Sequence, residues 1–189
     1  DNEVLVFQSR HLMEEAARPL HLDMSYQVKN GLSNDELYTH APVTVSFPEA
    51  EERQVIKVVV TPVDSATVRL SGFSLAVGGG GVRSEEVLDV HLNDTVSTPI
   101  GPMVITPTLY YTDVFYGKPV NVVKSNLEGV IEGYRGKLKV SLAGKTTTII
   151  NLVLDDVSTA RAEDILNMLI AVYNEDVIND KSQISLLYT

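Results

Sequence analysis

Two adjacent carboxylates are the residues of this chain that could most readily do chemistry. Asp155 and Asp156 stand between a predicted strand and a predicted helix, a position where an α/β enzyme can hold a metal ion or a catalytic acid. Val157 and Ser158 follow them as a helix start, and carboxylates near a helix N-terminus stabilise the helix without any reaction. No complete catalytic constellation surrounds them, so we predict a structural role and no enzymatic activity.

The run Gly144-Lys145-Thr146 is a second candidate, because it matches the end of a phosphate-binding loop. The full pattern requires another glycine five residues before Gly144, and that position is Lys139. The residues from Thr146 onward also favour a strand, whereas a phosphate-binding loop leads into a helix. We therefore predict a hairpin turn at residues 143–145. The glycine run at residues 78–81 lacks a following helix and is interpreted as a flexible loop.

Metal ligands are sparse in the sequence. The chain has no cysteine, which excludes disulfides and thiolate zinc sites. No histidine lies two or four residues from another, so no spacing marks a metal site. The histidines are His11, His21, His40 and His91. We predict neither a metal site nor a cofactor.

Aromatic side chains give the only hint of direct ligand contact. Tyr110, Tyr111 and Tyr116 lie close together in the sequence, with Phe115 among them. Aromatic rings can stack on sugars, although they more often fill a core or pair across strands. The three tyrosines are therefore weak candidates for glycan contact.

Charge and length limit the classes of partner. The chain has 189 residues, 44% of them hydrophobic, and a formal net charge of −10. Nucleic acids and anionic membrane surfaces attract clustered Lys and Arg, so we expect neither as a partner. No run of 18 apolar residues is present that would span a membrane.

The first 40 residues are predicted to form part of a mixed αβ domain. The apolar run at residues 4–7 favours a strand, and Ser9 is a plausible N-cap for the helix that follows. Pro19 would end that helix, and Asn30-Gly31 predicts a turn.

Residues 41–117 have a different character. Short runs of β-branched residues are separated by proline and glycine, which is typical of a small antiparallel sheet or sandwich. The predicted strands are residues 43–47, 55–60, 67–70, 87–92 and 103–111.

Residues 118–189 predict the order helix, strand, strand, helix. The two strands are residues 138–142 and 146–154, and the last helix begins near Ser158. Its apolar stripe predicts packing on a sheet. The stripe consists of Ala162, Ile165, Leu166, Leu169, Val172 and Tyr173. The predicted fold class is thus α+β. Residues 1–40 and 118–189 form a mixed αβ base domain, interrupted by an antiparallel, β-rich insertion at residues 41–117.

The two ends of the chain resemble Wzz-like polysaccharide chain-length determinants. Members of that family carry a strand and then a helix with the pattern Ala-x-x-x-x-Asn-x-x-x-x-x-Tyr, matched here by Ala162, Asn167 and Tyr173. The strand at residues 148–152 is also similar, as are residues 3–10 and the following Leu20-His21-Leu22. The similarity is closest to the larger exopolysaccharide co-polymerases that are often fused to a tyrosine autokinase, and it covers about half of the chain.

The resemblance implies a location and a set of partners. The chain would be the periplasmic domain of an inner-membrane protein that regulates the chain length and export of capsular polysaccharide or exopolysaccharide. The family forms homo-oligomeric rings, so the expected partners are further copies of the chain, the polysaccharide polymerase or export machinery, and nascent polysaccharide. Any kinase domain of the parent protein would be cytoplasmic, and none of its motifs is present in these residues.

Two alternatives stay open at the level of sequence. In the first, the β-rich insertion is a carbohydrate-binding β-sandwich without a role in length control, which would use the tyrosine cluster. In the second, the chain is an enzyme that combines Asp155 and Asp156 with a distant histidine.

Overall fold

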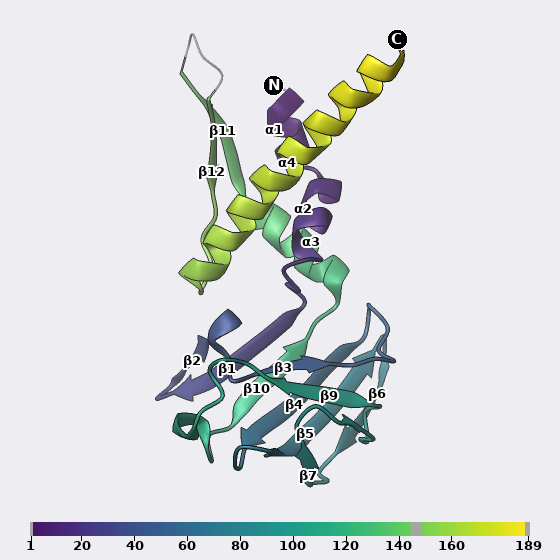
Figure 1. Cartoon of the computed structure of the whole chain (residues 1–189), viewed down its shortest axis with the longest axis vertical. Helices are drawn as coiled ribbons and strands as arrows, with labels where there is room; N and C mark the ends of the chain where they lie inside the picture. The colour runs from purple at the N-terminus through teal and green to yellow at the C-terminus, as the bar shows by residue number, and fades with distance from the viewer. Residues whose placement is uncertain (1, 145–148, 188–189) are drawn as a thin grey trace. The chain divides into compact units, whose positions relative to one another are not determined.

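The computed structural model describes residues 2–144 and 149–187. The chain divides into two compact units, which we call unit 1 (residues 1–22 and 128–189) and unit 2 (residues 23–127). Helices make up 30% of the chain and antiparallel strands 37%, which confirms the predicted α+β class and its β-rich portion. Figure 1 shows the elements of both units.

Unit 1 contains the helices and one β-hairpin. Its elements are α1 (Asn2–Phe7), α2 (Arg10–Ala17), α3 (Leu127–Lys137, whose first residue belongs to unit 2), β11 (Lys139–Ala143), β12 (Ile149–Val153) and α4 (Thr159–Leu187). The hairpin predicted around residues 143–145 is confirmed as a strand-to-strand connection, because β11 and β12 pair antiparallel up to Ala143 and Ile149. Lys145 and Thr146 lie outside the described residues.

The strand predicted at residues 4–7 is wrong, because these residues form helix α1. The error has a physical reason: a short continuous apolar run has no alternation, so periodicity cannot separate a strand from a helix. Phe7 is the one residue of α1 that is buried, whereas Leu5 is 66% exposed. The predicted cap of the next helix is confirmed, since the Leu12 amide donates to Ser9 Oγ at 3.2 Å.

The apolar stripe of α4 packs chiefly on helices, not on a sheet as predicted. α4 lies against α2, where Leu12 and Met13 are buried, as are Ile165 and Leu169 of α4. The Tyr173 ring contacts Phe7 of α1, with ring centroids 4.7 Å apart. The hairpin of β11 and β12 is not the main packing partner of α4, because none of the residues in these two strands is buried.

Unit 2 consists of two antiparallel sheets. The larger sheet has the order β2-β1-β10-β4-β5-β6, with β7 also paired to β5, and the smaller has the order β3-β9-β8. The strands are β1 (Met24–Asn30), β2 (Ser33–Glu36), β3 (Val43–Ser46), β4 (Val55–Pro62), β5 (Thr67–Val77), β6 (Gly80–Ser84), β7 (Leu88–His91), β8 (Thr95–Val96), β9 (Met103–Pro107) and β10 (Val120–Lys124). Two 3₁₀ turns, η1 (Tyr38–His40) and η2 (Asp113–Phe115), complete the unit.

The two sheets of unit 2 share one apolar core. Val43 and Ile105 of the smaller sheet and Val58 and Leu70 of the larger sheet belong to the same buried cluster, and Figure 1 shows β3 and β9 crossing the larger sheet. Tyr26 links the sheets by a hydrogen bond, since its hydroxyl oxygen accepts from the Val45 amide at 2.9 Å. Burial raises the pKa of Tyr26 to about 12, so the hydroxyl stays neutral. The alternation of apolar and polar residues correctly predicted this half-buried arrangement.

The β-rich unit extends beyond the predicted limits of residues 41 and 117. Strands β1 and β10, which flank those limits, pair with each other through Met24 with Lys124 and Tyr26 with Val122. β10 also pairs with β4, so both strands belong to the sheet of unit 2. The limits of unit 2 therefore lie at residues 23 and 127. The sequence could not predict these limits, because a pairing between distant strands leaves no local signal.

The glycine run at residues 78–81 is a tight hairpin, not the predicted flexible loop. Val77 pairs with Gly80 across the turn between β5 and β6. Gly78 has a φ of 57°, which favours glycine. A Cβ on Gly81 would lie 2.5 Å from the Leu75 carbonyl oxygen, so the strands approach each other only because this residue has no side chain.

Candidate functional site

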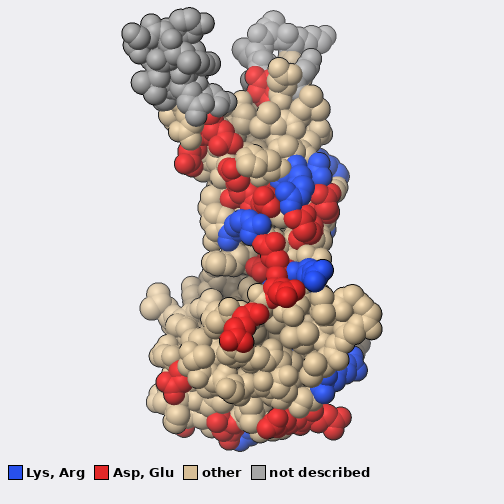
Figure 2. Space-filling view, turned by 90° about the vertical axis from the view of Figure 1, so that its right-hand side faces the viewer, with Lys and Arg blue, Asp and Glu red and all other residues tan. Residues whose placement is uncertain are grey.

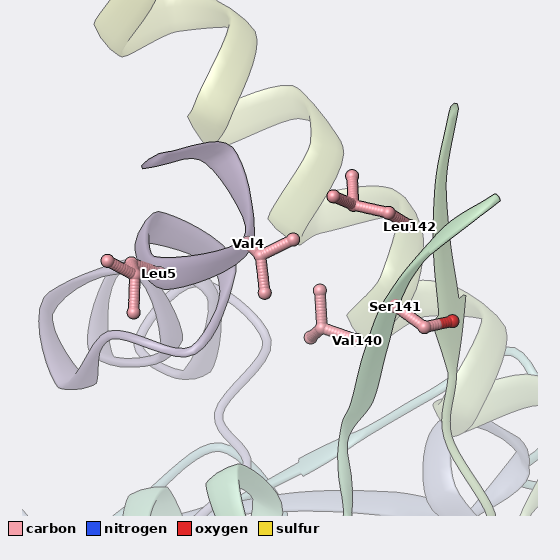
Figure 3. A pocket seen from close by; sticks show the side chains of 5 residues that line it. All are labelled: Val4, Leu5, Val140, Ser141 and Leu142. Carbon is pink, nitrogen blue, oxygen red and sulfur yellow. The ribbon is translucent and has the colours of Figure 1, made fainter. Parts of the chain in front are cut away.

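An apolar groove lies between α1 and β11 in unit 1. It encloses about 410 Å³ and is lined by Val4, Leu5, Val140, Ser141 and Leu142. Figure 3 shows Val4, Val140 and Leu142 directed into the space between the helix and the strand, with Ser141 on the opposite side of the strand. Leu5 and Leu142 are 66% and 45% exposed. The groove therefore presents aliphatic side chains to the surroundings, and it carries little polar surface for orienting a small polar substrate.

The hairpin that forms one wall of the groove is apolar on one face and mixed on the other. Val140 and Leu142 share one face with their cross-strand partners Leu152 and Ile150. The opposite face carries Ile149 and Val153, each about half exposed, together with the polar residues Lys139, Ser141 and Asn151. Among the strands that the structure describes, β11 and β12 pair only with each other, so each has an open edge. A two-stranded hairpin is marginal in isolation, and open apolar edges readily pair with another chain.

Other elements of unit 1 continue this apolar exposure. Val6 on α1, Val157 before α4, and Ile170 and Ile178 on α4 are all at least 40% exposed. Contiguous exposed aliphatic side chains, such as those at the groove, are characteristic of a protein–protein interaction surface, whereas single ones are ordinary. We refer to the groove together with the hairpin as the apolar surface of unit 1.

Charged pairs hold the helices that shape the groove. Arg10 of α2 forms an ion pair with Glu14 of the same helix and with Glu128 of α3. Arg135 of α3 donates to the Gln8 carbonyl oxygen, at the link between α1 and α2, over 3.1 Å. Figure 2 shows acidic and basic side chains intermingled on one face of the molecule. Because these groups are largely exposed, each pair contributes modestly, and their joint effect is to fix α1 and α2 relative to α3.

Asp156 is an anchor for the start of α4. Its carboxylate accepts from Arg161 Nε at 2.5 Å and from a second guanidinium nitrogen at 2.9 Å. The side chains of Asp156 and Arg161 are only 1% and 11% exposed. Burial alone would raise the pKa of Asp156, but the hydrogen bonds and charge of Arg161 outweigh it and hold that pKa below its ordinary value. The carboxylate is therefore ionised and held by its partner, while the neighbouring Asp155 is exposed.

The predicted tyrosine cluster is not a single platform for a sugar. Tyr110 packs edge-on against His40, with ring centroids 4.7 Å apart. Tyr111 and Tyr116 are neighbours at 6.3 Å, but their planes are inclined by 60°. The Tyr111 hydroxyl donates to the Asp64 carbonyl oxygen at 2.7 Å, which ties it to the turn between β4 and β5. Burial is the main cause that raises the pKa of Tyr111 to about 12.

A different groove in unit 2 combines a mainly apolar lining with several polar groups, and sequence reasoning missed it. It has a volume of about 920 Å³; its polar lining residues are Lys29, Asn30, Asn34, Asp35, Lys118 and Asn121, and its apolar ones are Val28, Leu37, Val59, Val114, Phe115 and Pro119. Amides, a carboxylate and ammonium groups beside an aromatic ring are groups that can bind sugar hydroxyls and pack on a sugar face. Phe115 is the one member of the predicted aromatic cluster in this lining. The polar lining residues come from the hairpin of β1 and β2, from β10 and from the segment just before β10, and the pairing of β1 with β10 is non-local.

The three residues of the family-like helix have different environments in α4. Ala162 is buried, Tyr173 is half-buried against Phe7, and Asn167 is exposed. Two of them therefore hold α4 in place, while Asn167 is accessible to a partner.

One group of acidic and imidazole side chains in the described residues is close enough together to be a potential metal site. His11, Glu15 and Asp176 form the one group of three or more potential metal ligands in that part of the chain, and neither Asp155 nor Asp156 belongs to it. No local pattern marks this group, because Asp176 is distant from the other two residues along the chain.

Within the described residues, no helix combines the length and the apolar character needed to cross a membrane.

Comparison with known proteins assigns the chain to no family. No protein-family model matches the chain, and a search of curated proteins finds no significant match.

Proposed function

We propose that this chain is the periplasmic, oligomerising part of an inner-membrane protein that regulates the chain length and export of a capsular polysaccharide or exopolysaccharide. In this role the chain catalyses no reaction. It contributes a repeated surface, so that several copies together hold the export machinery or the growing glycan by many weak contacts.

One observation carries the proposal. The two stretches that resemble the chain-length determinants lie at opposite ends of the sequence, and the N-terminal helices and α4 belong to the same unit. The Tyr173 of the family-like pattern contacts Phe7 of the similar N-terminal run. This arrangement agrees with a base domain that is assembled from both ends of the chain and carries an insertion.

The apolar surface of unit 1 supports the oligomeric part of the proposal. Its groove and its open hairpin edges offer both aliphatic contacts and unpaired backbone groups, which a second copy of the chain could satisfy together. A net charge of −10 makes copies repel each other, so association requires an apolar or hydrogen-bonded contact that outweighs this repulsion.

The first prediction concerns self-association. The double substitution Leu5→Asp and Leu142→Asp is expected to weaken it at least about tenfold, equivalent to roughly 1.4 kcal/mol, because each carboxylate would be desolvated in the contact. Sedimentation velocity over a concentration series measures the dissociation constant. Leu32→Asp is the matched control, since Leu32 is fully exposed in the turn of unit 2 between β1 and β2.

Circular dichroism is the control for folding of the double variant. We expect a spectrum like that of the wild-type chain, because both leucines are substantially exposed. Equal association of the double variant and the wild-type chain would remove the apolar surface from the proposal. A wild-type chain that stays monomeric at all concentrations would do the same.

The alternative of a carbohydrate-binding module would use the groove of unit 2 that Lys29 and Phe115 line, and not the predicted tyrosines. It differs from the proposal in its consequence for the cell, because a binding module without a role in length control leaves the polysaccharide length distribution unchanged when it is lost.

A further inference from the structure

His11, Glu15 and Asp176 bring three potential metal ligands together on two helices of unit 1. His11 and Glu15 are four residues apart on α2 and therefore share one face of that helix, with His11 Nε2 2.7 Å from a Glu15 carboxylate oxygen. Asp176 comes from α4, which packs against α2. One donor atom from each of the three residues lies within 4.8 Å of the other two.

The donor set suits a divalent transition metal. An imidazole nitrogen and two carboxylate oxygens are ligands of Zn²⁺ and related ions, and sites with three protein ligands leave a further position for water or another donor. In a tetrahedral site, ligand bonds of about 2.0–2.2 Å place donor atoms about 3.3–3.6 Å apart. Small rotations of these side chains would therefore close the site without any movement of the helices.

Burial and charge also favour a cation at this place. Glu15 and Asp176 are half-buried, and His11 is exposed, so an ion can reach the site while the carboxylates are partly shielded from solvent. The two carboxylates of the group repel each other, and a divalent cation between them would remove this repulsion.

We propose that His11, Glu15 and Asp176 form a binding site for a divalent transition-metal ion of the Zn²⁺ type, which links α2 to α4. The ion acts as a cross-link that holds α4 against the N-terminal helices. The proposal does not depend on the function proposed above, because metal binding is measured on the purified chain.

Isothermal titration calorimetry with ZnCl₂ on the metal-free chain tests the site. We expect saturable binding of one ion per chain. His11→Ala and Asp176→Asn should each weaken this binding at least tenfold, because each removes one of three ligands. Two controls change residues of the same type outside the cluster: His91→Ala in β7 and Glu175→Gln on the exposed side of α4. Both should bind as the wild-type chain does.

Thermal unfolding followed by circular dichroism at 222 nm provides an independent readout. Zn²⁺ should raise the unfolding midpoint of the wild-type chain and of both controls, but not of His11→Ala or Asp176→Asn. All four variants should retain the wild-type spectrum at low temperature. The proposal is overturned if the wild-type chain shows no saturable binding, or if the cluster variants bind Zn²⁺ as tightly as the controls.

Discussion

Replacement of Asp156 with alanine is expected to lower the free energy of unfolding of unit 1 by about 3–5 kcal/mol, the range for breaking a buried ion pair from one side. The side chain of Arg161 is only 11% exposed, and its guanidinium donates two hydrogen bonds to the Asp156 carboxylate. Without that carboxylate, the charge stays buried next to the first turn of α4. Urea denaturation followed at 222 nm measures the loss, because the α-helices lie in unit 1, apart from the first residue of α3.

The neighbouring aspartate provides the control for this experiment. Asp155 is exposed, so Asp155→Ala should change the free energy of unfolding by no more than about 0.5 kcal/mol. If Asp156→Ala had an equally small effect, the ion pair would not anchor α4. If both variants folded normally but abolished a cellular activity, the enzyme hypothesis built on these two carboxylates would regain its basis.

Lys124→Met is expected to destabilise unit 2 by at least about 2 kcal/mol, because it removes the charged hydrogen bonds that a buried ammonium group donates to three backbone carbonyl groups. Lys124 is only 6% exposed, and its Nζ donates to the carbonyl oxygens of Glu51, Glu52 and Gln54, each at 2.8 Å. The substitution keeps the length of the side chain and deletes the donor. The loop before β4 would then lose the group that fixes its backbone.

Lys57→Met is the matched control for this second prediction. Lys57 is exposed on β4, and its loss should cost no more than about 0.5 kcal/mol. The measurement is urea denaturation followed at about 215 nm, where the sheet signal is strong. Equal stability of the two variants would show that the three carbonyl groups find other donors.

Features with a local signal could be predicted from the sequence. Ser9 was identified as a helix cap because capping depends on residues within one turn, and the Leu12 amide indeed donates to it. Val43 and Val45 alternate with polar residues, and they are buried in β3 as this period predicts. The turn at Asn30-Gly31 is present for a similar reason, since Gly31 has a φ of 63°.

Features that depend on distant residues could not be predicted in this way. The limits of unit 2 differ from the predicted ones because β1 pairs with β10. Neither strand contains a pattern that identifies the other as its partner. Lys124 stands at an inward position of β10, where the strand pattern alone favours an apolar residue. The grouping of His11 with Asp176 and the groove between α1 and β11 also arise only when segments from both ends of the chain pack together.

The central claim is that the parent protein sets polysaccharide length, and the length distribution of surface polysaccharide on a gel tests it most directly. Four strains are compared: a strain lacking the parent gene, and the same strain carrying the intact gene, the Leu5→Asp and Leu142→Asp gene, or the Leu32→Asp gene. We predict a collapsed or shifted distribution without the gene, restored by the intact gene and by Leu32→Asp but not by the double variant. An unchanged distribution with normal export in the strain without the gene would contradict the account, and the groove of unit 2 that Lys29 and Phe115 line would then be the place to test for a free-standing binding module.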